Sequence, residues 1–306
     1  MSTKAKSKGK KKQRGERTAS SWLIFALMTV YLVFMWMPFP FARVIYTALT
    51  GLVAAMAAHE LMNAVKSKNQ LLNVLTMGVS AFMPFVFSYG LKLPLLVILP
   101  LYVLAVLFIM VSMNKKTKFV DVLTALYSSL WISFGFSCFV LIRDIYIKYD
   151  GIYLKQEGFF FVMLVFGCSW VPDGLAYLVG KRFGKHKLCP VISPKKTVEG
   201  AAGGVLLSGV ALLIVYVLYS LIVEHIYDIT LFAAYGWLKY VYLYIITIVL
   251  CVISIFGDLA ASVIKRNFGI KDYSQLFPGH GGIMDRFDSS LFVLPCIYGL
   301  ITVLNL

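Results

Sequence analysis

Apolar runs of about 20 residues recur from one end of this chain to the other, and they constrain its fold more than any other feature. Each run is long enough to cross the roughly 30 Å hydrocarbon layer of a bilayer as a helix. Only 14% of the 306 residues are charged, whereas about a quarter are charged in a soluble domain. This excludes soluble enzymes, secreted disulfide scaffolds and disordered chains. The sequence predicts an all-α, polytopic integral membrane protein.

The runs predict about nine transmembrane helices. They cover residues 21–40, 44–64, 71–89, 93–113, 119–141, 159–180, 202–223, 241–257 and 290–305. The first run has no small-residue cleavage site, so we expect a retained anchor rather than a signal peptide. We expect three parts: a basic disordered cytosolic tail at 1–20, a transmembrane region of about five spans at 21–158, and a catalytic transmembrane region of about four spans at 159–306.

The basic residues predict the orientation of these spans. The net charge is +15, and residues 1–20 contain eight Lys and Arg. With this tail in the cytosol, 23 of the 29 Lys and Arg fall in cytosolic loops and six fall outside, as the positive-inside rule requires. We expect the amino terminus in the cytosol and the carboxyl terminus outside. The tail is expected to lie near anionic membrane lipid rather than to bind nucleic acid.

Acidic residues in the apolar runs are candidates for function, because a carboxylate in hydrocarbon is costly. Glu60 and Asp121 lie near span ends, where packing could satisfy them, and their roles are left open. Asp173 differs, since Ser169 and Tyr177 stand four residues to either side and form one polar stripe with it. Such a stripe serves either chemistry or contact between helices.

Two loops predicted on the cytosolic side, 181–199 and 258–289, carry most of the polar chemistry. In the first, Ser193, Lys195, Lys196 and Thr197 precede a helix start at Glu199. Hydroxyl, ammonium and unpaired backbone N–H groups together suit a phosphate. A charged patch facing lipid headgroups is the alternative reading of this loop.

The second loop is denser in charge. Asp258, Ser262 and Lys265 share one helical face. The glycines around His280, among them Gly281 and Gly282, could let backbone N–H groups surround an anion. The further charged residues of the segment include Arg266, Lys271, Asp285, Arg286 and Asp288. Carboxylates with phosphates are the ligands that Mg²⁺ prefers, so these residues predict metal-assisted phosphate chemistry at the cytosolic membrane face rather than a surface network of ion pairs.

The same segment resembles the phosphatidate cytidylyltransferase (CDP-diacylglycerol synthase) family. The shared positions are Ser262, Lys265-Arg266, Lys271-Asp272, Ser274, Phe277-Pro278, His280-Gly281-Gly282 and Asp285-Arg286-Phe287-Asp288. Upstream, they are Trp170, Asp173, Ala176-Tyr177, Gly180, Ser193-Pro194-Lys195-Lys196-Thr197 and Glu199-Gly200. The resemblance extends over about 165–289. Gly174 departs from it, since the family more often has a hydroxyl residue there.

The resemblance implies transfer of a cytidylyl group from CTP to phosphatidate, with Mg²⁺ as cofactor. The length of the chain is closer to that of bacterial members than to that of the longer eukaryotic ones, so we expect a bacterial cell membrane. We expect a catalytic group made of Asp258, Asp285, Lys265, Arg286 and His280. Substrate-binding residues would be Ser193, Lys195, Lys196, Thr197, Ser262, Arg266, Lys271, Gly281 and Gly282, and metal ligands Asp258, Asp285, Asp288 and Asp173. A second cation and a homodimer are left open.

Three alternatives remain at this stage. A CTP-dependent enzyme could act on another lipid, as polyprenol kinases and CDP-ether-lipid synthases do. A CDP-alcohol phosphotransferase is disfavoured, because Asp173-Gly174-Leu175-Ala176 matches only the opening of its motif. A transporter would place its acids near the midplane, where only Glu60 would fit. Consumption of CTP distinguishes the enzymes from a transporter.

Overall fold

The structure is a computed structural model that describes residues 2–37, 39–90, 92–149 and 151–304. It contains two compact units, each built from two pieces of chain. The first unit joins Met1–Phe134 to Phe268–Arg286, and the second joins Gly135–Asn267 to Phe287–Leu306. This division differs from the predicted one at residue 158, since the segment after Asn267 returns to the amino-terminal unit.

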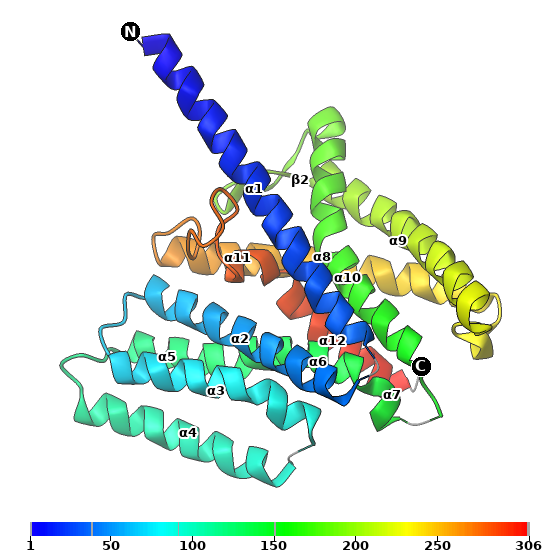
Figure 1. Ribbon diagram of the computed structural model, residues 1–306. Coiled ribbons are helices and arrows are strands. Elements are labelled where there is room, and N and C mark those ends of the chain that lie inside the picture. Colours follow the sequence, from blue (N-terminus) through cyan, green and yellow to red (C-terminus); the bar gives the residue numbers. More distant parts are fainter. Residues whose placement is uncertain (1, 38, 91, 150, 305–306) are drawn as a thin grey trace. The chain divides into compact units, whose positions relative to one another are not determined.

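The first unit is a group of helices with one long loop. Its helices are α1 (Ser2–Trp36), α2 (Pro40–Ala64), α3 (Gln70–Ser88), α4 (Lys92–Ser112), α5 (Phe119–Tyr127) and the π-helical turn η1 (Ser128–Ile132). Helices α2, α3 and α4 lie side by side (Figure 1). The basic segment predicted as a disordered tail is here the first part of α1.

Local sequence explains where these helices begin, and buried apolar side chains hold them together. Pro40 occupies the first turn of α2, where a missing N–H costs nothing. Asn69 caps α3 by accepting a 3.2 Å hydrogen bond from the N–H of Leu72. Asp121 accepts one of 2.8 Å from the N–H of Lys118, so this buried acid caps α5. The buried core cluster consists of Met62, Leu72, Tyr102, Val106, Ile109, Val122 and Ala125.

The second unit is built mainly from three long helices, α8, α9 and α10, of 29, 30 and 30 residues. Its elements are α6 (Ser133–Arg143, from Gly135 on), α7 (Ile145–Lys148), α8 (Lys155–Phe183), β1 (Lys187–Cys189), β2 (Ser193–Thr197), α9 (Val198–Tyr227), η2 (Ala233–Tyr235), α10 (Leu238–Asn267) and α12 (Ser290–Leu304). The short helix α11 (Met284–Phe287) lies at the boundary between the units in the sequence.

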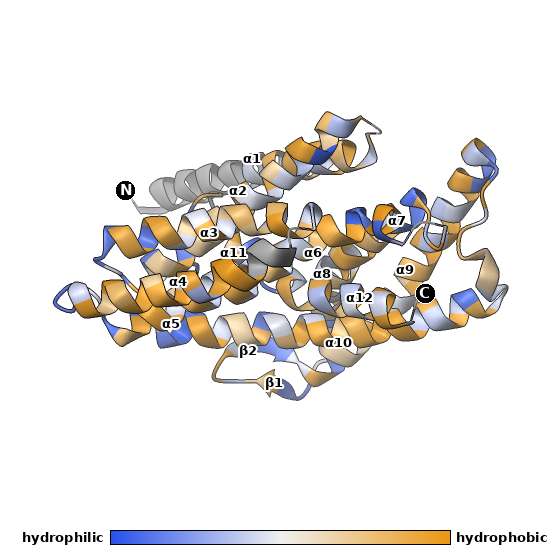
Figure 2. Cartoon of the chain, turned by 90° about the horizontal axis from the view of Figure 1, so that it is seen from below, coloured by the Kyte–Doolittle hydropathy of each residue, from blue (hydrophilic) through white to orange (hydrophobic). Residues whose placement is uncertain are grey.

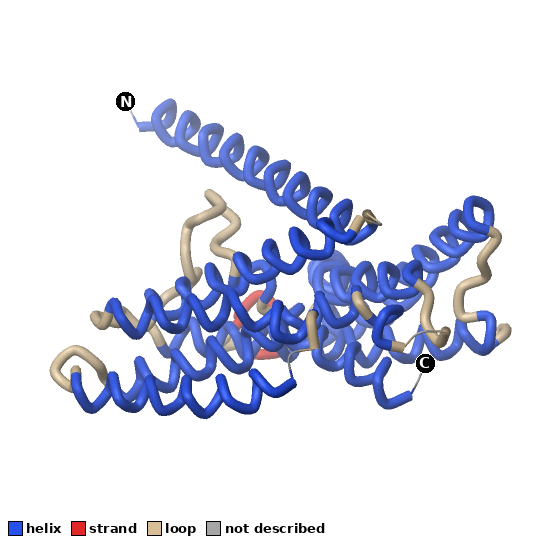
Figure 3. The backbone as a smooth tube through the Cα atoms, turned by 60° about the horizontal axis from the view of Figure 1, so that its bottom comes forward, coloured by secondary structure: helices blue, strands red, loops and turns tan. Residues whose placement is uncertain are grey.

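The second unit also contains one small sheet beside its helices. Strands β1 and β2 form a small antiparallel hairpin in which Lys187 pairs with Thr197 and Cys189 with Ser193, drawn in red in Figure 3. Thr197 then caps α9, its hydroxyl accepting a 3.2 Å hydrogen bond from the N–H of Gly200. The predicted helix start is confirmed, and the hairpin leads directly into it.

Among the residues that the structure describes, six helices are long and apolar enough to cross a membrane. They are Pro40–Ala64, Gln70–Ser88, Phe119–Arg143, Lys155–Phe183, Val198–Tyr227 and Leu238–Asn267. Three shorter apolar helices, Ser20–Trp36, Leu96–Ser112 and Ser290–Val303, coincide with the other three predicted spans. Apolar residues dominate along the helices, and hydrophilic ones gather at many of their ends and beside the hairpin (Figure 2). The helical membrane fold is thus supported, while the count of nine transmembrane spans stays a prediction.

Candidate active site

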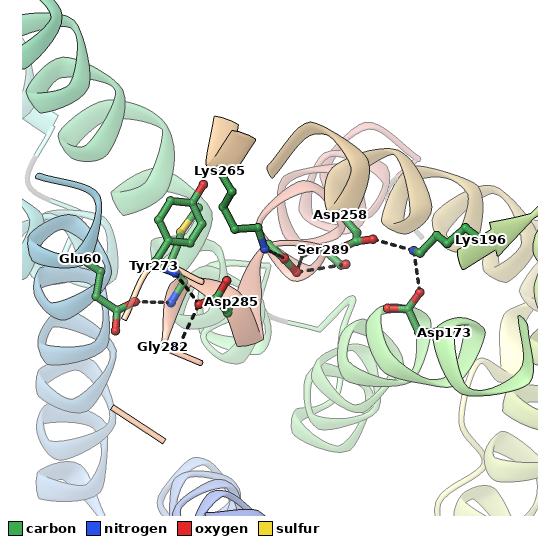
Figure 4. A network of polar contacts seen from close by, with 11 residues as sticks. Glu60, Asp173, Lys196, Asp258, Lys265, Tyr273, Gly282, Asp285 and Ser289 are labelled. Carbon is green, nitrogen blue, oxygen red and sulfur yellow. Dashed lines mark hydrogen bonds and ion pairs between the residues drawn. The ribbon is translucent and has the colours of Figure 1, made fainter. Parts of the chain in front are cut away.

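In the second unit, one ammonium group lies between two carboxylates. Lys196 Nζ is 2.9 Å from Asp173 Oδ1 and 2.6 Å from Asp258 Oδ2, as Figure 4 shows. Burial alone would lower the pKa of Lys196, but the two carboxylates outweigh it and raise that pKa above its usual value. The ammonium therefore stays charged at neutral pH. Three residues that the sequence analysis singled out are brought together here.

Three different elements supply this triad. Asp173 follows Pro172 on α8, and its side chain is 49% exposed. Asp258 lies on α10, which continues ten residues beyond the predicted span end at 257 and thus carries Ser262, Lys265 and Arg266 as helical residues. Lys196 is placed by β2, directly before the cap of α9.

A second ion pair lies at the end of α10. Lys265 is buried, with Nζ 3.4 Å from Asp288 Oδ2. Asp288 is buried too, and its Oδ1 accepts a 2.8 Å hydrogen bond from the N–H of Ser289. Phe287, the residue before, contacts the rings of Phe136, Phe139 and Phe166 edge-on. This aromatic packing fixes the start of the segment that carries Asp288.

In the first unit, the glycine-rich loop 277–286 is shaped by carboxylates. Asp285 Oδ2 accepts hydrogen bonds from the N–H groups of Tyr273 at 2.8 Å and Gly282 at 3.0 Å. Glu60, from α2, accepts from Ile283 N–H at 3.0 Å, Met284 N–H at 2.8 Å and the hydroxyl of Ser274 at 2.6 Å. Figure 4 shows the contacts of Asp285 with Tyr273 and Gly282, with Glu60 nearby.

These contacts change the reading of the loop glycines. The sequence predicts that N–H groups around Gly281 and Gly282 surround a phosphate, but those of Gly282, Ile283 and Met284 already donate to Asp285 and Glu60. Gly281 has φ +80°, and a Cβ there would lie 2.7 Å from Asp285 Oδ2. The glycines therefore allow carboxylates of the chain itself to approach the backbone.

The remaining predicted site residues are more dispersed. His280 contacts α1: its Nδ1 is 3.0 Å from the hydroxyl of Ser20 and its Nε2 is 3.3 Å from that of Ser21. Ser193 and Lys195 lie on β2 with Lys196, and Lys195 is exposed. Lys271 is exposed in the loop after α10, and Arg286 lies in α11.

The residues present fit Mg²⁺ as a partner of substrate phosphates. Among the residues the structure describes, no group of three or more His, Cys, Asp and Glu forms a metal site. Mg²⁺, however, is usually held by one or two carboxylates together with waters and phosphates. Asp173 and Asp258 converge on a single cation, the Lys196 ammonium, and provide such a donor set. The roles of all four predicted metal ligands, Asp173, Asp258, Asp285 and Asp288, stay predictions.

Comparison with known sequences identifies the family. The model of the cytidylyltransferase family matches residues 16–304, nearly the whole chain. The chain belongs to this family. Phosphatidate cytidylyltransferase of Staphylococcus saprophyticus is 43% identical over 168 residues, covering 54% of this chain and 59% of that protein. The enzymes so named from Staphylococcus epidermidis and Bacillus subtilis are 37% identical over 198 residues and 36% over 178 residues.

These matches cover 63% of this chain and 66% of the S. epidermidis protein, and 58% and 57% for B. subtilis. The chain therefore spans less than two thirds of the length of these curated relatives. The resemblance inferred from the motifs over 165–289 is confirmed at the level of the family, and the family match extends well before residue 165.

Sequence reasoning missed two features of this cytidylyltransferase-family site. The partners of Glu60 lie more than 200 positions away, and no local pattern reveals them. The second feature is the close contact of α9 with α8. It did have a signal in the sequence, because Gly200 and Gly204 form a GxxxG pattern, which is typical of close helix contact in membranes. A Cβ on Gly204 would lie 2.8 Å from the carbonyl oxygen of Pro172 on α8.

Proposed function

We propose that this protein transfers the cytidylyl group of CTP to phosphatidate, forming CDP-diacylglycerol and releasing pyrophosphate. Membership of the cytidylyltransferase family and the names of the relatives support the reaction class. The observation that carries the proposal is the triad in which Lys196 links Asp173 to Asp258. It combines a phosphate-binding cation with carboxylates suited to Mg²⁺.

The reaction requires little proton chemistry. An oxygen of the phosphatidate phosphate forms a bond to the α-phosphorus of CTP, the bond from that phosphorus to the bridging oxygen breaks, and pyrophosphate leaves with the electron pair. A phosphate monoester is already largely dianionic near neutral pH, because its second pKa is about 6. The main barrier is bringing two anions together, so catalysis consists of charge neutralisation and alignment.

The residues of the second unit suit this task. Lys196, charged at neutral pH, would bind a phosphate oxygen, with Lys195 beside it on the same strand. Asp173 and Asp258 would hold Mg²⁺, which when bound supplies a Lewis acid for phosphate oxygens. Lys265 is engaged with Asp288 and would orient that carboxylate. His280, whose two nitrogens face Ser20 and Ser21, has a weaker case as the group that protonates pyrophosphate.

The setting is part of the proposal. We propose nine spans with the amino terminus in the cytosol, so that both chemistry-bearing segments face the cytosol, where CTP is found. The membrane would be a bacterial cell membrane, in line with the organisms of the relatives. Lipid substrate would reach the site from that membrane. A homodimer stays a prediction.

Pyrophosphate release tests the proposal. Purified protein in mixed micelles would receive Mg²⁺, CTP or ATP, with or without phosphatidate. We expect release only with CTP and phosphatidate together. We expect Asp258→Asn to lower the rate of pyrophosphate release by about 100-fold or more, as the loss of a positioning group can do. Asp121→Asn, the same replacement at an acid that caps another helix, is the matched control for folding. Release with ATP as readily as with CTP, or full activity in Asp258→Asn, would refute the assignment.

A further inference from the structure

Glu60 makes contacts that its own helix does not require. It lies on α2 and is only 5% exposed, and it accepts three hydrogen bonds: one from Ser274, before the loop, one from Ile283 in the loop and one from Met284 in α11. Asp121, the other buried acid of this unit considered above, bonds to Lys118 three residues away and so caps its own helix. The carboxylate of Glu60 instead reaches chain more than 200 residues further on. Its contacts therefore stabilise the loop rather than α2.

The loop is built to admit this carboxylate. A Cβ added to Gly282 would overlap both carboxylate oxygens of Glu60. Any side chain at this position would force the acid or the loop to move. Glycine at 282 is thus explained by Glu60 itself, although the sequence alone suggests a phosphate as the reason.

Glu60 and Asp285 share a continuous stretch of backbone. The N–H of Gly282 donates to Asp285, and the next two N–H groups, of Ile283 and Met284, donate to Glu60. Three consecutive donors are therefore divided between two carboxylates. A shift of the Glu60 contacts would disturb the peptide unit that donates to Asp285, because the three donors are consecutive and each rigid peptide unit shares a Cα with the next one.

We propose that Glu60 is a positioning residue of the cytidylyl-transfer site, holding the loop 277–286 from α2 in the conformation that orients Asp285. The inference rests on the proposed function and on the prediction from the sequence that Asp285 and Arg286 act in that reaction. Glu60 itself touches no substrate. Its effect passes through the backbone that it binds.

The first test is Glu60→Gln, which keeps the size of the side chain. The amide retains one acceptor oxygen, and its NH₂ group must face donors on the other side. We expect kcat to fall by about 10-fold to 100-fold, as a misplacement of about 1 Å can cause, while the KM for CTP changes little and the melting temperature in detergent stays near that of Asp121→Asn. A fall in melting temperature with unchanged kcat would show a merely structural role and overturn the proposal.

The second test uses the steric overlap between a Cβ at residue 282 and the carboxylate of Glu60. Gly282→Ala alone should lower kcat strongly, because its methyl group displaces Glu60. In the Glu60→Ala background the space is open, so adding Gly282→Ala should cost little more. Gly78→Ala, at a helical position with no atom near the added Cβ, is the control for glycine replacement. Fully additive losses would contradict a direct relation between residues 60 and 282.

Hydrogen exchange separates this inference from the proposed activity. In the full-length protein, Glu60→Gln should speed amide exchange at Ile283 and Met284 by tenfold or more, while the amides of α3 stay unchanged. This readout needs no substrate. Faster exchange without any cytidylyl transfer by the wild type would leave the anchoring role standing and refute the proposed reaction. Unchanged exchange at both amides would overturn the anchoring role whatever the activity.

Discussion

The acidic side chains of this chain differ in role because they face different partners. Asp121 caps a helix, Glu60 binds a distant loop, and Asp173 and Asp258 share the ammonium of Lys196. Charge-assisted hydrogen bonds of this kind contribute about 1.5–3 kcal/mol each. Removing one member of a buried ion pair leaves the other charge without compensation, so the loss then exceeds that value.

Lys196 offers the sharpest prediction at this scale. Replacing it in Lys196→Met removes the cation between two carboxylates, which then repel each other, and removes a proposed phosphate ligand. We expect pyrophosphate release to fall about 100-fold, in the range of lost charge stabilisation in other enzymes. Lys187→Met, an exposed lysine of the same hairpin, is the control and should retain activity. Equal rates in the two variants, measured at saturating CTP, would remove Lys196 from the site.

The sequence predicted which neighbouring residues share a helical face, but it did not predict contacts between distant segments. Asp173 stands out because its polar stripe interrupts an apolar helix, and Asp258 because it shares a helical face with Ser262 and Lys265. The pairing of Asp173 with Asp258 through Lys196 joins three segments, so it depends on tertiary packing that no periodicity encodes. The same holds for Glu60, whose position near a span end suggested only local packing.

At the scale of elements, close packing of α8 and α9 positions the hairpin. Gly204 lies against Pro172 and Ala176 of α8, and Gly200 approaches the carbonyl of Ala176. Small residues let helix backbones approach in membranes, where van der Waals contact replaces the hydrophobic effect. Thr197 and Lys196 immediately precede α9, so its placement on α8 decides where Lys196 meets Asp173.

Gly204→Val tests this packing. A Cβ at 204 would lie 2.8 Å from Pro172 O and 2.9 Å from Ala176 N, so the helices must separate. We expect a loss of about 1–3 kcal/mol of stability, typical of overpacking, together with lower pyrophosphate release. Gly78→Ala has open space around its Cβ and should lower neither the stability nor the pyrophosphate release. Thermal unfolding in detergent, with activity measured below the transition, is the measurement. A Gly204→Val protein as stable and active as the wild type would contradict the argument.

At the scale of the whole molecule, hydropathy predicted where the helices of the described residues lie. Each predicted span overlaps a helix there, since about 20 apolar residues in a bilayer must satisfy their backbone groups internally. The division into units was not predictable. It depends on the return of Phe268–Arg286 to the first unit, and contacts such as those of Glu60 make that return.

The asymmetry of charge predicts the membrane topology. We expect Lys116→Cys, in a loop predicted to be cytosolic, to react with a membrane-impermeant maleimide only after cells are permeabilised. Ile152→Cys, in a predicted outer loop, should react in intact cells. The background would replace Cys189 and Cys296 by serine, since the other three cysteines are buried. Reaction of both positions from the same side would contradict nine spans with a cytosolic amino terminus.

The most direct test of the central claim follows the phosphorus atoms of CTP. Purified protein in phosphatidate micelles would receive CTP labelled with ³²P at either the α- or the γ-phosphate, and the lipid would then be extracted. The account predicts label in lipid from the α-phosphate only, with the γ-label recovered in pyrophosphate. Label from the γ-phosphate in lipid would identify a kinase, and no label from either position, in protein shown to be folded, would contradict cytidylyl transfer to phosphatidate.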